Sequence, residues 1–207
     1  IRFRNTVDRS YTTTTVGSGQ AVLTSLSWHP DGKTLAIGAL DWSARVFDVE
    51  SQSVVQTVRC LEQVHGIRFH ENGKWIITAL QDGTLRVWNP ETGERVGPMR
   101  KHQVPVRSVA TCDDFLVSVS GSSADSAIRF WPANDDAYEN GLLFKFAAPV
   151  RTVDFVPGTE TLAILDWNGK LRLWELRRPY TSAAELQQAT TETLGASRNA
   201  DGTLLPM

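Results

Sequence analysis

The sequence predicts an all-β fold, a β-propeller whose blades are four-stranded antiparallel sheets, and three observations lead to this prediction. The segments TLRVWNP, AIRFWPA and KLRLWEL share an apolar–Arg–apolar–Trp pattern, and their tryptophans, Trp88, Trp131 and Trp174, are spaced 43 residues apart. Each unit holds short runs of β-branched and aromatic residues that are separated by turn residues. A period of about 40–45 residues with four strands per unit is typical of propellers, in which every sheet buries its faces against neighbouring sheets.

The second unit shows the four-strand plan most fully. It consists of VHGIRFH, the turn ENGK, WIITAL, the turn QDG, TLRVWNP, the turn ETGE and RVGPM. The first unit repeats this order with LTSLSWH, TLAIGAL, ARVFDV and VVQTVR, and Phe47 takes the aromatic position of the third strand. Arg4 in IRFRNT stands 43 residues before Phe47 and occupies the same position. We expect the aromatic residues at this position to fill the space between blades.

The repeat divides the chain into blades and two end segments. The predicted blades cover residues 20–60, 61–102, 103–146 and 147–178. Residues 1–19 supply outer strands of a preceding or a closing blade. In one interpretation they are the third and fourth strands of a preceding blade. In the other, SYTTTTV completes the blade at 147–178 and closes a four-bladed ring.

We favour a partial propeller: the C-terminal blades of a longer chain, or a piece that another polypeptide completes. An incomplete ring leaves an apolar flank and unpaired strand edges, which predicts association. The chain does not begin with Met, and we expect it to be a piece or a processed product of something longer.

The last segment, 179–207, differs from the blades in composition. Pro179 has no N–H to donate to a ladder and marks the exit from the last strand. Ser182 and Glu185 form a capping-box pattern, and Gly195 is a stop signal, so one short helix is predicted over 182–194.

Composition excludes several classes of protein. The 207 residues include 21 Lys and Arg against 23 Asp and Glu, a net charge of -2, which lacks the basic surplus of a general nucleic-acid binder. No run approaches the roughly 18 apolar residues that span a membrane, and the start has no apolar signal region. Cys60 and Cys112 are the two cysteines, which favours free thiols in a reducing compartment and a cytoplasmic protein.

The units resemble WD-repeat (WD40) blades from residue 1 to about 178. This resemblance implies a hydrogen-bonded chain in each blade, from a His ahead of the first strand through a Ser or Thr and a turn Asp to the third-strand Trp. The third unit matches with His102, Ser118, Asp125 and Trp131. The second unit has Thr78, Asp82 and Trp88, with Cys60 in place of His. The first keeps only Asp41, and the fourth has Trp174 with Asn168 at the Asp position.

The sequence predicts no catalytic residue, cofactor or metal site. His29 and His70 occupy the same position of successive units, and His65 begins a strand, so no histidines have the spacing of metal ligands. A triad of Ser118, His102 and Asp125 is conceivable, but the structural chain explains these residues better, and the sequence has no GxSxG elbow. VGSGQ is not followed by a helix, so it fails as a phosphate loop.

The resemblance implies that partners dock on the face that carries the loops ahead of the first strands and the turns between second and third strands. The residues placed there are Thr24, His65, Arg107 and Arg151 from the first strands and Leu40, Trp42, Gln81 and Trp167 from the turns. Arg and Trp are enriched among binding anchors, and this face suits an acidic protein or peptide segment. The alternative is that the tryptophans pack under loops and the arginines line a solvated channel.

The sequence therefore favours a non-catalytic protein–protein interaction scaffold without nucleic-acid or membrane partners. Its partners would be a protein or peptide, together with a second chain or missing blades that complete the ring. The alternative is the C-terminal sensory or scaffold propeller of a larger signalling enzyme. The tail is similar to extensions of bacterial WD-repeat signalling proteins, which often carry kinase or NTPase domains upstream. A propeller enzyme has the least support, since no pair of carboxylates faces the expected channel.

Overall fold

The computed structural model describes residues 2–4, 9–14, 16, 21–112, 115–121, 126–132, 142–146, 149–176, 197–198 and 204–205. All of the regular structure in this part of the chain is β-strand, which confirms the predicted all-β class. The helix predicted over 182–194 and the predicted Asp125 contact lie outside the described residues.

Three blades have four strands each, and their strands follow one another from the inside of the fold outward. The first blade is β3 (Leu23–Trp28), β4 (Thr34–Ala39), β5 (Ser43–Asp48) and β6 (Ser53–Arg59). The second is β7 (Val64–Phe69), β8 (Ile76–Leu80), β9 (Thr84–Trp88) and β10 (Arg95–Lys101). The third is β11 (Val106–Thr111), β12 (Phe115–Gly121), β13 (Ser126–Pro132) and β14 (Leu142–Lys145). Every pairing within them is antiparallel, as expected for consecutive strands joined by tight turns.

The fourth blade has three strands among the described residues: β15 (Val150–Phe155), β16 (Thr161–Asp166) and β17 (Leu171–Glu175). At the other end of the chain, β1 (Arg2–Arg4) and β2 (Tyr11–Thr13) pair with each other and with no other described strand, so β2 is not the fourth strand of the blade at β15–β17. Two short strands, β18 (Ser197–Arg198) and β19 (Leu204–Leu205), extend the third blade beyond β14. The sequence did not predict these two strands.

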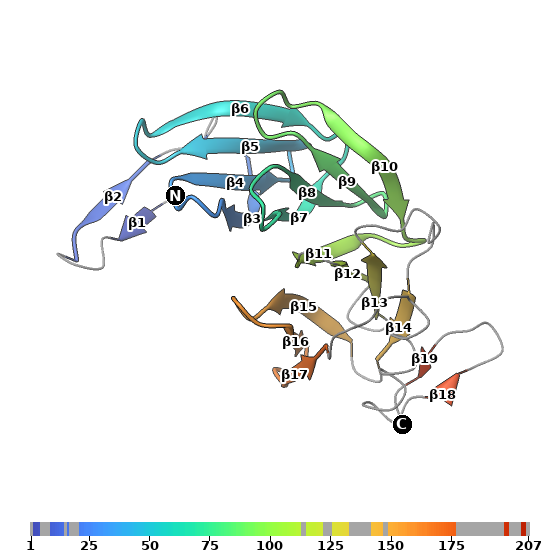
Figure 1. Ribbon diagram of the computed structural model, residues 1–207. Coiled ribbons are helices and arrows are strands. Elements are labelled where there is room, and N and C mark those ends of the chain that lie inside the picture. Colours follow the sequence, from blue (N-terminus) through green and yellow to red (C-terminus); the bar gives the residue numbers. More distant parts are fainter. Residues whose placement is uncertain are drawn as a thin grey trace.

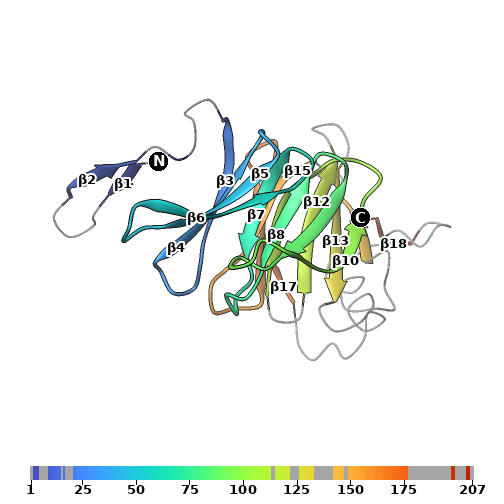
Figure 2. The same cartoon turned by 90° about the horizontal axis from the view of Figure 1, so that it is seen from above.

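The four sheets fan out as an open arc, with the innermost strands β3, β7, β11 and β15 next to one another (Figure 1). Seen from above, the β1–β2 hairpin lies to one side of the first blade (Figure 2). The predicted partial propeller agrees with this arrangement. The ring does not close within the described residues.

Apolar side chains fill the joints between blades. At the joint of the first and second blades, Val46 and Val58 pack in one buried cluster with Ile67, Phe69 and Trp88. Equivalent clusters form at the next two joints. Single hydroxyl groups add backbone contacts across the joints, since Ser27 accepts a hydrogen bond of 2.9 Å from the Phe69 N–H.

One ion pair reaches past a neighbouring blade. Arg68 in β7 donates from Nε to the Val109 carbonyl of the third blade and pairs through a second nitrogen with Asp154 of the fourth, at 2.8 Å. Three successive blades are therefore linked by one side chain.

Candidate partner-binding face

Strand register brings the predicted binding residues to one face of the arc, which runs across all four blades. The first residue of each inner strand pairs with the end of the second strand, as in Val64 with Leu80 and Val150 with Asp166. The loops ahead of the inner strands and the turns after the second strands therefore lie on the same face of the arc, which we call the loop face. All eight predicted binding residues come from these segments.

In three blades the predicted inner-strand residue contacts the turn of its own blade. His65 Nε2 hydrogen-bonds Gln81 Oε1 in the second blade. Arg107 Nε donates to the Gly121 carbonyl at 2.7 Å in the third. Arg151 lies over the Trp167 indole at 5.3 Å in the fourth, a cation–π distance.

The first blade differs. Thr24 donates instead to the Val64 carbonyl of the second blade, at 2.6 Å. Leu40 is half-buried and its N–H donates to the Val22 carbonyl, while Asp41 and Trp42 of that turn are exposed. The loop face thus carries a contact between inner strand and turn in three blades and an exposed Trp42 in the first.

Most arginines beneath the loop face are neutralised by an aspartate of the same blade. The pairs are Asp41–Arg45, Asp82–Arg86 and Asp166–Arg172. Burial raises the pKa of Asp41, but hydrogen bonds from Arg45 and Ser43 outweigh this effect and hold it below its usual value. The Arg172 hydrogen bond, together with backbone N–H groups, lowers the pKa of Asp166. Asp41 and Asp166 are therefore ionised and engaged at neutral pH.

Arg107 and Arg151 have no carboxylate partner within the described part of the chain. Both are exposed. The loop face therefore has a local positive surplus although the whole chain is slightly acidic.

Asn168 holds the turn position that Asp82 holds in the second blade, as the sequence predicted, but the carboxylate that pairs with the third-strand arginine of the fourth blade is Asp166. Asp166 Oδ1 accepts from the N–H groups of Asn168 and Lys170, and Oδ2 accepts from Arg172 at 2.8 Å. The registers Ala79↔Leu85 and Leu165↔Leu171 give the two turns the same length, so Asn168 stands where Asp82 stands in the second blade. The carboxylate of the fourth blade comes from two residues earlier, at the end of β16.

Trp42 has a strained backbone. Its φ is +66°, and the equivalent residue of the second blade is Gly83, with φ of +82°. A bulky residue in the left-handed region costs on the order of 1–3 kcal/mol and is a reason to look for function. The side chain is 57 % exposed, so packing in this chain does not account for its presence.

We expect glycine to be more stable than alanine at position 42, by about 1 kcal/mol, because only glycine relieves the positive φ. At Trp167, whose φ is not positive, the order should reverse by about 0.5–1 kcal/mol. Urea unfolding of Trp42→Gly, Trp42→Ala, Trp167→Gly and Trp167→Ala measures both differences. The same order of stability at both sites would contradict the assigned strain.

The sequence did not point to three further apolar residues of the loop face. Val22, Leu61 and Val104 precede successive inner strands and are 61 %, 71 % and 46 % exposed. Leu61 also has a positive φ, +63°. The sequence signal that could have identified them is an apolar residue in the loop ahead of the inner strand. With Trp42 and Trp167, five exposed large apolar side chains gather on this face.

The third blade contains a buried hydrogen-bonded chain. Ser118 Oγ contacts His102 Nε2 at 2.7 Å and accepts from Trp131 Nε1 at 2.8 Å. Desolvation of the ring is the main reason that the pKa of His102 falls to about 3, and Arg129 lowers it further. His102 is therefore neutral at physiological pH and serves packing, which leaves it unavailable as an exposed base.

The second blade has a shorter version of the same chain. Trp88 Nε1 donates to Thr78 Oγ1 at 2.9 Å, and Thr78 also contacts the Cys60 thiol at the histidine position. Asp82 accepts from the backbone and hydroxyl of Thr84 in the adjacent turn. Burial raises the pKa of Cys60 to about 12, so its thiol is unreactive at neutral pH.

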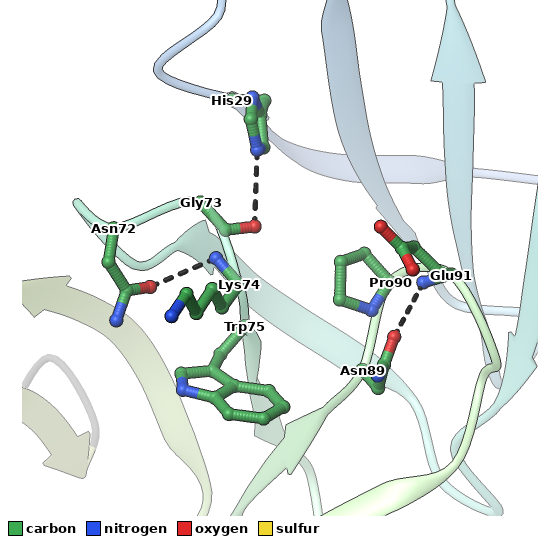
Figure 3. A pocket seen from close by; sticks show the side chains of 8 residues that line it. All are labelled: His29, Asn72, Gly73, Lys74, Trp75, Asn89, Pro90 and Glu91. Carbon is green, nitrogen blue, oxygen red and sulfur yellow. Dashed lines mark hydrogen bonds between the residues drawn. The ribbon is translucent and has the colours of Figure 1, made fainter.

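A pocket on the face opposite the loop face lies between the first two blades (Figure 3). His29 closes one side, with Nε2 at 3.1 Å from the Gly73 carbonyl, and Trp75, Lys74 and Glu91 line the remainder. Asn72 and Asn89 accept hydrogen bonds from their own turns. Its histidine is thus engaged in joining two blades. Within the described ranges, no three His, Cys, Asp or Glu side chains are grouped to hold a metal ion.

Among the described residues, no helix has the length and apolar character that crossing a membrane requires.

Two families match parts of the chain. The Anaphase-promoting complex subunit 4 WD40 domain matches residues 2–65, and the WD domain, G-beta repeat, matches residues 53–89. The first match includes β1, β2 and the whole first blade. The repeats are therefore of the WD40 type, as the sequence predicted.

Curated relatives are similar at low identity. The COMPASS component SWD3 of Saccharomyces cerevisiae is 22 % identical over 81 % of this chain and 55 % of that protein. Subunit 5 of transcription initiation factor TFIID of Caenorhabditis elegans is 28 % identical over 81 % of the chain and 26 % of that protein. The DENN domain and WD repeat-containing protein SCD1 of Arabidopsis thaliana is 23 % identical over 70 % of the chain. The match covers 12 % of SCD1, so this chain spans only part of the relatives that it matches.

A solved structure supports the fold. The crystal structure of the computationally designed Ika4 protein matches with a TM-score of 0.60 at 18 % identity, over 78 % of this chain and 96 % of that one. At this identity the similarity concerns the fold alone.

Proposed function

We propose, from the premise that this chain carries WD40 repeats, that it is a non-catalytic scaffold whose loop face binds an acidic protein or peptide segment. One observation carries the proposal: Arg107 and Arg151 lack carboxylate partners among the described residues, and they share the loop face with five exposed large apolar side chains. Aromatic and arginine side chains on a rigid frame are frequent energetic anchors of interfaces. Such a frame binds with little change of shape.

Charge selects the partner class. The unpaired arginines attract carboxylates, while Trp42, Trp167 and Leu61 offer apolar contact area beside them. A segment that combines acidic and apolar residues satisfies both features, and its binding should weaken as salt screens the charges.

The relatives are named as components of larger assemblies, such as the COMPASS component and the TFIID subunit, which supports a protein partner for this chain. The limited share of SCD1 that the match covers supports the second possibility, that these repeats are one part of a larger signalling protein. We further propose that additional blades complete the ring.

The test selects phage-displayed random 12-residue peptides on the wild-type chain. We expect the enriched peptides to contain acidic and apolar residues. The triple variant Arg107→Glu, Arg151→Glu, Trp167→Ala should bind them at least tenfold more weakly in fluorescence anisotropy, because it reverses the charge and removes one anchor.

The matched control is the double variant Lys33→Glu, Lys74→Glu, which makes the same charge change on the face opposite the loop face. It should keep wild-type affinity. Peptides that bind the triple variant as tightly as wild type, or a selection without enrichment, would contradict the proposal.

A further inference from the structure

The innermost strand of the first blade exposes residues that the other blades bury. Its fourth residue, Leu26, is 50 % exposed, whereas the equivalent residues are at most 3 % exposed: Ile67, Val109 and Val153. Its sixth residue, Trp28, is 51 % exposed, against 4 % for Phe69 and 7 % for Phe155. The same positions thus differ more than sevenfold in exposure.

These positions face the preceding blade. Ile67 and Phe69 of the second blade are buried against Ala44, Val46 and Val58 of the first. By the same geometry, Leu26 and Trp28 face the place of a blade ahead of the first one. The exposed patch is therefore one half of a blade joint.

The outer half of this face is already covered. Leu35, Ile37 and Phe47 are at most 2 % exposed and form a cluster with Val16, which follows β2. Val58, near the end of the outer strand β6, contributes similarly to the next joint. The β1–β2 hairpin thus precedes the first blade as the outer two strands of a blade, in agreement with the 43-residue spacing of Arg4 and Phe47.

We propose that the patch formed by Leu26 and Trp28 is covered by a two-stranded WD40-type hairpin from the polypeptide directly ahead of Ile1. This hairpin forms the inner two strands of the blade to which β1 and β2 belong. Its second strand pairs with the edge of β1 that no described strand occupies. Three residues separate the second and third strands in each of the first two blades, so the hairpin belongs immediately before β1.

A second copy of the chain is the competing occupant. Leu171 and Leu173 of β17 are 60 % and 64 % exposed, while the equivalent Ala44 and Val46 are 1 % and 3 % exposed, so the far flank is the other half of a joint. Head-to-tail docking would match the two flanks. However, in such a dimer β2 would serve as the fourth strand of the second copy's last blade and would pair with its β17. The edge of β2 that this pairing needs is already occupied by β1 over three residues.

The experiment supplies the inner hairpin from the chain itself. A second copy of residues 61–84 is placed directly ahead of Ile1, which keeps the 43-residue register of Arg4 with Phe47. The control extension has the same residues in shuffled order. Urea unfolding is then measured with and without Leu26→Asp, and with Leu173→Asp as the matched exposed leucine of the other flank.

We expect Leu26→Asp to lower the urea midpoint at least three times more in the extended chain than in the 207-residue chain or the shuffled control, because the extension buries Leu26. Leu173→Asp should have the same effect in all three. An equal effect of Leu26→Asp in all three chains would overturn the proposal.

Light scattering tests the second copy. A mass of twice the chain for the 207-residue protein, reduced to one chain by Leu26→Asp and by Leu173→Asp, would overturn the proposal in favour of self-association. The inference rests on the proposed larger ring and not on the loop face. Peptide binding by the 207-residue chain and by the extended chain therefore distinguishes its failure from failure of the scaffold proposal.

Discussion

Replacing Trp131 with alanine is expected to lower the free energy of unfolding by about 3–5 kcal/mol, the largest effect among our predictions. The indole is 1 % exposed and fills the joint between the second and third blades with Leu85, Val109 and Leu116. Its loss leaves a cavity and also removes the Nε1 hydrogen bond to Ser118, which is fully buried. Ser118 keeps its hydrogen bond with His102, so the cavity accounts for most of the expected loss.

Trp167→Ala is the matched control. Trp167 is 47 % exposed and its ring is covered by Arg151, so its removal should cost about 1 kcal/mol or less. Urea transitions followed by far-UV circular dichroism give both values. Similar losses for the two variants would show that the Trp131 joint does not hold the blades together.

Stability should fall by about 2 kcal/mol between pH 7.5 and pH 5 because of His102. The pKa of this residue is about 3 in the folded chain and about 6.5 when unfolded, so the unfolded state binds a proton that the folded state refuses. The contribution is complete above pH 6.5 and is lost progressively as the pH falls toward 3. Asp41, Asp48 and Asp166, with lowered pKa values, act mainly below about pH 4.

His102→Gln keeps a side chain that hydrogen-bonds Ser118 but has no titrating group. Its stability should be lower at pH 7.5 and should change little between pH 7.5 and 5. Urea midpoints of both proteins across this range test the assignment. A variant with the same pH slope as wild type would exclude His102 as its source.

The spacing of the repeats was sufficient to predict most of the fold. Equivalent positions predict one another, so strand order, the aromatic joints and the loop face followed from the alignment of four units. The interpretation of residues 1–19 needed the structure, because a Thr-rich strand has no apolar face that selects β1 or β17 as its partner. The structure pairs Tyr11–Thr13 with Arg2–Arg4.

The candidate site was less predictable where the repeats depart from their own period. Asn168 holds the turn position, yet the partner of Arg172 is Asp166, two residues earlier, and the repeat alignment does not predict a carboxylate from that position. The left-handed backbone of Trp42 and Leu61 is a tertiary feature, since neither residue type favours positive φ. Exposure of Leu26 depends on which neighbour is present, and a repeat pattern in one blade carries no information about that.

The Arg68–Asp154 contact changes how the end of the arc opens. In a repeat array where each unit contacts only its neighbours, the free energy of detaching the terminal unit is set by a single interface. Here the fourth blade is also tied to the second, so its detachment breaks contacts in three units at once. The cooperative length of unfolding at this end is therefore longer than the nearest-neighbour joints alone would give. Both charged side chains are partly exposed, so added salt shortens that length by screening their attraction.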